Sequence, residues 1–219
     1  MDIKDIIGSN NKNTTLVAVS KTKPVEKIQK IYNEGQIDFG ENRVNELIYK
    51  YNLLPKNINW HMIGHLQRNK VKLIIPFIHL IHSVDSVRLI NKIENESRKI
   101  NKKTNILLQV HIAQEESKYG FTFGQVKDLF DNDFFNSFEY LSIRGFMGMS
   151  TFTNDKNQIR KEFNNLKLLF DEIKSKFNKV NKNIILDSLS MGMSGDYKIA
   201  LEEGSNIIRI GSLIFGERE

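Results

Sequence analysis

The chain has 219 residues, of which 40% are hydrophobic and 26% charged, with three prolines, no cysteine and a net charge of +6. This composition is typical of a folded globular domain and excludes intrinsic disorder, disulfide bonds and cysteine-based zinc or nucleophilic sites. No apolar run approaches the ~18 residues of a membrane span, and no apolar secretory segment follows Met1, so we expect a cytoplasmic protein without a membrane partner.

The positive charge comes mainly from lysines spaced as on helix surfaces. These are Lys27, Lys30, Lys50, Lys161, Lys167, Lys174 and Lys176. The densest basic group, residues 98–103, falls where a helix is expected to end, and cations there offset the helix dipole. No basic–aromatic motif accompanies these residues, so we interpret the lysines as a solvated surface and expect no nucleic-acid partner.

Eight short apolar runs along the chain predict β-strands. They cover residues 15–20, 37–40, 60–64, 80–84, 106–112, 141–147, 184–189 and 207–211. Continuous apolar runs of this length favour strands that are buried on both faces, as in a parallel sheet.

Amphipathic segments between these runs predict helices. Pro24 suits the first turn of one helix, and Asp85 and Ser86 are candidate N-caps of another. The longest helix is expected over residues 155–177, with an apolar stripe that we interpret as core. The stripe consists of Ile159, Phe163, Leu166, Leu169, Phe170 and Ile173.

Eight strand–helix repeats in 219 residues predict an α/β fold: a single (β/α)8 TIM barrel over residues 1–219. A doubly wound open sheet is the alternative, because a count of strands does not close a barrel. The short segment at residues 2–8 is too small to cover the barrel end, so we expect a partly open bottom or a self-association surface there.

The end of the first predicted strand carries two lysines, Lys21 and Lys23, followed by Pro24. In an extended segment both lysines lie on the same side, where two ammonium groups repel by about 2 kcal/mol at an effective dielectric near 20. Such repulsion lowers a lysine pKa and favours a nucleophile that condenses with a carbonyl. The alternative is that Lys21 is simply solvated.

Two glycine-rich turns at the other end of the sequence predict an anion site. Residues 191–196 follow the seventh strand and include Ser194 and Asp196, both good N-cap residues, while Gly211 and Ser212 follow the eighth. Glycines let backbone N–H groups approach a ligand, and the loops after strands seven and eight often hold phosphate in TIM barrels.

Arg209 lies between Ile208 and Ile210, so strand alternation points it to the opposite face. An inward guanidinium needs an acceptor. The acceptor is either a ligand or a carboxylate such as Glu41 or Asp187.

Six motifs occur in an order and spacing that match a known family. They are Val19-Ser20-Lys21-Thr22-Lys23-Pro24; Phe39-Gly40-Glu41-Asn42; Trp60-His61-Met62-Ile63-Gly64-His65-Leu66-Gln67; Ile143-Arg144-Gly145-Phe146-Met147-Gly148-Met149; Leu189-Ser190-Met191-Gly192-Met193-Ser194; and Arg209-Ile210-Gly211-Ser212. Through them the sequence resembles the pyridoxal phosphate homeostasis (YggS/PROSC) family over nearly the whole chain. The segment before the first strand is shorter than is usual in that family.

The resemblance implies a fold-type III barrel that binds pyridoxal 5'-phosphate (PLP), like the N-terminal domain of alanine racemase without its C-terminal β-domain. It implies that Lys21 forms the Schiff base, an internal aldimine, with PLP. Ser194, Gly195, Gly211 and Ser212 would hold the phosphate. Arg209 would face the pyridine nitrogen, and Asn42 and Met193 would flank the ring.

The function implied by the resemblance is PLP (vitamin B6) homeostasis without catalytic turnover, with PLP-dependent apo-enzymes as candidate partners and a monomer or weak dimer as the assembly. The alternative is a small racemase-like enzyme acting at the amino-acid α-carbon, which needs acid and base groups on both ring faces. Tyr119 is the one tyrosine we consider as a proton donor. His61 and His65 flank a strand end instead of sharing a helix face, so we expect no metal site.

Overall fold

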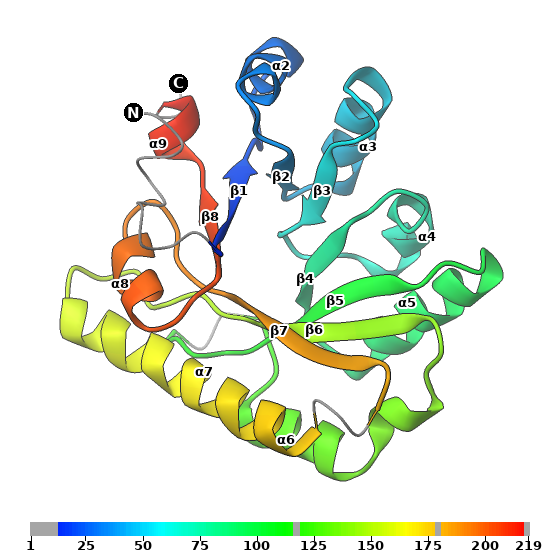
Figure 1. The fold of residues 1–219 in the computed structure, drawn as a ribbon, viewed down its shortest axis with the longest axis vertical. Coiled ribbons are helices and arrows are strands. Elements are labelled where there is room, and N and C mark those ends of the chain that lie inside the picture. Colours follow the sequence, from blue (N-terminus) through cyan, green and yellow to red (C-terminus); the bar gives the residue numbers. More distant parts are fainter. Residues whose placement is uncertain (1–12, 116–118, 178–180, 217–219) are drawn as a thin grey trace.

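The structure, a computed structural model, describes residues 13–115, 119–177 and 181–216. Within them eight parallel strands form a closed barrel in the order β1 to β8, and helices surround the strands (Figure 1). The barrel closes where Thr15 to Ala18 of β1 pair with Ile207 to Ile210 of β8. The predicted (β/α)8 barrel is therefore confirmed, and the alternative of an open sheet is wrong. The surface predicted at residues 2–8 lies outside the described residues.

All eight predicted strands are present. They are β1 Thr15–Val19, β2 Asp38–Glu41, β3 Asn59–Met62, β4 Leu80–Val84, β5 Thr104–Gln109, β6 Leu141–Met147, β7 Ile184–Ser190 and β8 Ile207–Ile210. The prediction ran furthest past the end of β5. Val110 still donates its N–H to the Met147 carbonyl at 2.8 Å, but it pairs with Phe121 in an isolated bridge outside the barrel strands.

Helices follow nearly every strand. They are α2 Val25–Asn33, α3 Val44–Leu53, η1 Arg68–Lys70, α4 Val71–Ile74, α5 Val87–Lys99, α6 Phe123–Asp131, η2 Phe134–Ser137, α7 Lys156–Phe177, α8 Tyr197–Glu202 and α9 Ser212–Phe215. Ser86 takes the N-cap position of α5 as predicted, although its side chain makes no capping bond. Pro24, predicted in the first turn, is instead the N-cap of α2, one position earlier. In the part of the chain described, no helix is both long and apolar enough to cross a bilayer.

Two apolar layers hold the barrel together. The larger one lies between strands and helices and contains Phe39, Trp60 and Phe146, together with the buried stripe of α7, as predicted. The smaller one fills the inside of the barrel. It consists of Val17, Leu80, Leu107, Met147 and Ile207, with Met149 packed against it. Because this inner layer is small, polar side chains occupy the rest of the interior, and they lead to the candidate site.

Candidate functional site

A cavity of about 470 Å³ lies at the carboxyl ends of the strands, the end where TIM barrels carry their sites. Every site residue predicted from the sequence lines this cavity. These residues are Lys21, Asn42, Met193, Ser194, Gly195, Arg209, Gly211 and Ser212. The rest of its lining consists of Val19, Lys23, Ile63, Met149, Phe152 and Gly216. The cavity therefore combines polar and apolar walls.

Lys21 and Lys23 reach the cavity from a tight turn between β1 and α2. The prediction of an extended segment is wrong, because the chain must reverse between the end of β1 and the start of α2. Thr22 adopts a left-handed conformation with φ of 64°, and the Lys23 N–H donates to the Ser20 carbonyl at 3.0 Å. Both lysines still line the cavity, as expected from the motif. The Lys23 ammonium donates to the Gly216 carbonyl at 3.3 Å, across the mouth from α2.

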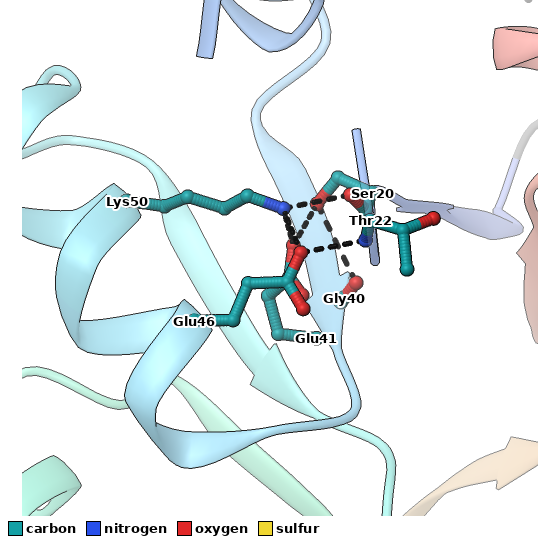
Figure 2. Close-up of polar contacts among 6 residues, drawn as sticks. All are labelled: Ser20, Thr22, Gly40, Glu41, Glu46 and Lys50. Carbon is teal, nitrogen blue, oxygen red and sulfur yellow. Dashed lines mark hydrogen bonds and ion pairs between the residues drawn. The ribbon is translucent and has the colours of Figure 1, made fainter. Parts of the chain in front are cut away.

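A buried ion-pair network supports this turn from below (Figure 2). The Lys50 ammonium, on α3, donates to the Ser20 carbonyl and to Oε1 of both Glu41 and Glu46, each at 2.7 Å. Glu46 Oε1 also accepts the Thr22 N–H at 2.6 Å, and Glu41 Oε1 accepts the Ser20 hydroxyl at 2.6 Å. Residues on both sides of Lys21 are therefore fixed to the same three charged side chains.

The assignment of Lys50 to the solvated lysine surface is wrong. Lys50 is 2% exposed, because it lies on the same face of α3 as the buried Val44 and Leu47. That three-residue spacing was the sequence signal for an inward lysine. Burial raises the pKa of Glu41 against the opposing effect of Lys50, and Glu41 Oε2 has no hydrogen-bond partner among the described residues.

The loops after β7 and β8 present unpaired backbone donors to the cavity. Within the described residues, the N–H groups of Ser194, Gly195 and Ser212 donate to no protein acceptor. The Gly211 N–H makes one long bond of 3.3 Å to Ser194 Oγ. Unpaired N–H groups converging on one place form an anion-binding site. The Asp196 carboxylate shapes the first loop by accepting the Met193 N–H at 2.6 Å.

Arg209 is 4% exposed and lies inside the barrel, as alternation predicted. Its Nη1 donates to Ser190 Oγ at 2.5 Å and its Nη2 to the Gly148 carbonyl at 3.0 Å. The alternative of a salt bridge to Glu41 or Asp187 is wrong, since Glu41 binds Lys50 and Asp187 binds Arg144. Burial lowers the pKa of Arg209 to about 10, so the guanidinium stays cationic at neutral pH.

A hydrogen-bonded column runs from Arg209 through the barrel interior. Ser190 Oγ lies 3.0 Å from His82 Nδ1, His82 Nε2 lies 2.9 Å from His61 Nδ1, and His61 Nε2 lies 3.0 Å from Asp38 Oδ1. With neutral rings each group can donate to the next, from Arg209 to Asp38. Complete burial holds the pKa of His82 well below its ordinary value, which keeps that ring neutral.

Sequence reasoning missed this column because its five members lie on five different strands. His65, considered with His61 as a metal pair, instead bonds Asp85 at 3.1 Å, at the carboxyl ends of β3 and β4. Tyr119, considered as a proton donor, stacks on His65 and does not line the cavity.

The cavity can therefore hold an anionic group at the β7 and β8 loops and an apolar ring against Val19, Ile63 and Met149. Two amines, Lys21 and Lys23, and one guanidinium surround that space. Asn42 Oδ1, which is buried without a partner in the described residues, supplies an acceptor that no protein group uses. The arrangement fits a flat, phosphorylated ligand that a lysine can capture.

Comparison with known proteins agrees with this geometry. The alanine racemase N-terminal domain family matches residues 3–219. Alanine racemase of Clostridium difficile shares the fold, with a TM-score of 0.76 at 16% identity; the match covers 94% of this chain and 53% of that one. Fold and site thus define a barrel of the alanine racemase N-terminal class.

Curated relatives narrow the class. A pyridoxal phosphate homeostasis protein of Aquifex aeolicus is 38% identical over 93% of this chain and 87% of its own. The Schizosaccharomyces pombe protein of that name is 34% identical over 96% of this chain and 86% of its own length. PipY of Synechococcus elongatus, solved with PLP bound, superposes with a TM-score of 0.82 at 29% identity, over 94% of this chain and 93% of PipY. The chain belongs to the family of pyridoxal phosphate homeostasis proteins.

Proposed function

We propose that this protein binds PLP in the cavity at the carboxyl ends of the strands and acts in PLP homeostasis. The observation that carries the proposal is that Lys21, Arg209 and the unpaired N–H groups of the β7 and β8 loops all line one cavity. The names of the curated relatives and the PLP-bound structure of PipY support it.

Each lining residue has a role in this proposal. The Lys21 amine captures the cofactor, and the N–H groups of Ser194, Gly195 and Ser212 hold its phosphate with the Gly211 backbone and the serine hydroxyls. Arg209 is the partner of the pyridine nitrogen. When bound, PLP supplies an electrophilic aldehyde carbon and an electron-withdrawing ring. The Ser190 and Gly148 oxygens hold the Arg209 guanidinium in place for that contact.

Asn42 and Met193 form the sides of the ring site. Asn42 offers the unpartnered Oδ1 to a ring substituent, while the thioether of Met193, which is 40% exposed, covers the ring from the solvent side. We also propose that this exposed side is where the cofactor passes to PLP-dependent apo-enzymes in the cytoplasm. A monomer or weak dimer stays our prediction for the assembly.

The composition of the cavity wall supports a role without catalytic turnover. Racemisation at an α-carbon needs an acid and a base on opposite faces of the ring. Among the described lining residues, the ionisable side chains are Lys21, Lys23 and Arg209, with no carboxylate, histidine or tyrosine. Lys23 is tied to the Gly216 carbonyl and Arg209 to Ser190 and Gly148. The racemase alternative therefore has no evident second acid–base group.

Absorbance spectroscopy tests the proposal. Titration of the full chain with PLP should produce the visible band of a lysine-bound cofactor. Lys21→Ala should abolish that band, while the matched control Lys23→Ala, two residues away on the same cavity wall, should keep it. A wild-type protein without the band, or a Lys21→Ala variant with an unchanged band, would refute the assignment.

A further inference from the structure

The amino-terminal end of the barrel, opposite the PLP cavity, holds a second cavity of about 130 Å³. Asp38, His61 and His79 line it, and one metal-binding atom of each lies within 4.8 Å of the others. Asp38 opens β2, His61 lies on β3, and His79 immediately precedes β4. Neighbouring parallel strands therefore bring the three side chains to the same edge of the barrel.

We propose that Asp38, His61 and His79 form a binding site for one divalent transition-metal ion, with zinc as its simplest occupant. Two imidazoles and a carboxylate are a ligand set of open zinc sites, which leave a position for water. A cavity of about 130 Å³ has room for the ion and its water, since one water takes roughly 30 Å³ of liquid volume.

His61 is the most firmly held of the three ligands. It is 1% exposed, and its two ring nitrogens face His82 and Asp38 at 2.9 Å and 3.0 Å. A metal-bound imidazole carries its proton on the other nitrogen and donates it to a neighbour. His82 Nε2 is that neighbour, so His61 Nε2 can present its lone pair toward Asp38. In that state an ion between Nε2 and the carboxylate replaces their direct hydrogen bond.

Asp38 is oriented for the same role. Its Oδ1 accepts hydrogen bonds from Asn59 at 3.1 Å and from His61 at 3.0 Å. Within the described residues, its Oδ2 accepts none.

His79 completes the set from the exposed rim of the cavity. Its ring centroid lies 5.2 Å from that of His61. A neutral imidazole at this position has a ring-nitrogen lone pair available for a metal. Arg144 lines the same cavity, and its bond to Asp187 at 3.0 Å offsets part of its repulsion of a cation.

The test measures metal binding by the full chain after chelator treatment, without added PLP. Calorimetry with Zn²⁺ should give one saturable site per chain, and Co²⁺ should give the intense visible absorption of tetrahedral coordination. His79→Ala and Asp38→Asn should each weaken binding more than about tenfold, the loss that even removal of an outer-sphere partner causes. Circular dichroism should show that both variants remain folded.

His65→Ala is the matched control, because it removes a surface histidine from the opposite end of the barrel and should bind Zn²⁺ as the wild type does. No saturable Zn²⁺ site in the wild type, or unchanged affinity in both His79→Ala and Asp38→Asn, would overturn the proposal. These readouts involve no PLP, so their failure leaves the proposed PLP function untouched.

Discussion

The position of Lys21 is set by side chains that do not line the cavity. Lys50 and Glu46 fix the backbone on either side of it, and Glu41 binds the Ser20 hydroxyl. Ordering one residue's backbone costs about 1–2 kcal/mol, so a turn that is already fixed avoids that cost when the ligand binds. The buried network therefore acts by positioning Lys21.

The Lys50→Met substitution tests this network. It leaves the Glu41 carboxylate buried without its cation, so we expect the free energy of unfolding to fall by about 3–5 kcal/mol in urea titration. Adding Glu41→Gln should recover part of that loss, because the unpaired charge is removed. Lys27→Met, at an exposed position on α2, is the control and should change stability by less than about 0.5 kcal/mol. A loss below about 1 kcal/mol in Lys50→Met would contradict the account.

The Ser190 hydroxyl joins Arg209 to His82, and the Ser190→Ala substitution tests that link. Ser190→Ala leaves a buried guanidinium donor and His82 Nδ1 without their partner, so we expect unfolding to become easier by about 1–3 kcal/mol and PLP affinity to fall. Ser188→Ala, on the same strand, should behave like the wild type. Equal PLP affinity and stability in the two variants would show that Ser190 does not position Arg209.

Motifs at strand ends, with the family resemblance that they carry, predicted the polar residues that line the PLP cavity, and strand alternation predicted that Arg209 on β8 points inward. The column through His82 and His61 was beyond that reasoning, because it depends on which strands become neighbours inside a closed barrel. The burial of Lys50 had a signal in its helix spacing with Val44 and Leu47, but its carboxylate partners come from both β2 and α3. The metal-ligand set of Asp38, His61 and His79 is hidden for the same reason.

The loop between β7 and α8 is the element that shapes the anion end of the cavity. Gly192 has φ of 91°, and a Cβ atom there would lie 2.6 Å from the Ala200 Cβ and 2.9 Å from the Tyr197 Cα. Gly195, three residues later, has open space where a Cβ would stand. One glycine is therefore required by the fold of the loop, and the other lies at the ligand side.

These two glycines make a matched pair of variants. Gly192→Ala should lower the free energy of unfolding by more than about 1 kcal/mol and weaken PLP binding, because the loop must shift to relieve the clash. Gly195→Ala should leave stability within about 0.5 kcal/mol of the wild type. Thermal unfolding and PLP titration measure both, and a stable, tightly binding Gly192→Ala variant would contradict the assigned role of the loop.

The positions of the strands were predictable from the sequence, and the conformations of the connections were not. Apolar runs located β4 and β6 with their observed ends, since buried parallel strands need continuous apolar residues. The turn at Thr22 escaped prediction because a non-glycine residue with positive φ has no sequence signature of its own. It persists because the Thr22 N–H is held by Glu46.

The whole molecule is a barrel with two different ends. The carboxyl end gathers cations and N–H donors around the PLP cavity, and the amino end gathers Asp38, His61 and His79. The column from Arg209 to Asp38 joins them. β7 and β8, whose loops would hold the anion, share the register pair Ser190 with Ile207, and backbone bonds from Asn206 to Leu189 and from Arg209 to Gly192 also join the two segments.

Ligand binding should therefore stabilise the closed barrel. PLP at a hundred times its dissociation constant should raise the free energy of unfolding by about 2.7 kcal/mol, seen as a higher melting temperature. Pyridoxal, which lacks the phosphate, should give a clearly smaller rise at the same concentration because the N–H groups of the β7 and β8 loops stay unfilled. An equal rise with both ligands would contradict the assigned phosphate site.

The central claim, that Lys21 captures PLP, is tested most directly by locating the bond itself. The PLP-loaded full chain is reduced with borohydride, which makes the lysine–cofactor link permanent, then digested and sequenced by tandem mass spectrometry. The account predicts one pyridoxyl group per chain, on Lys21. A group on Lys23 or any other lysine, or no stable label at all, would contradict it.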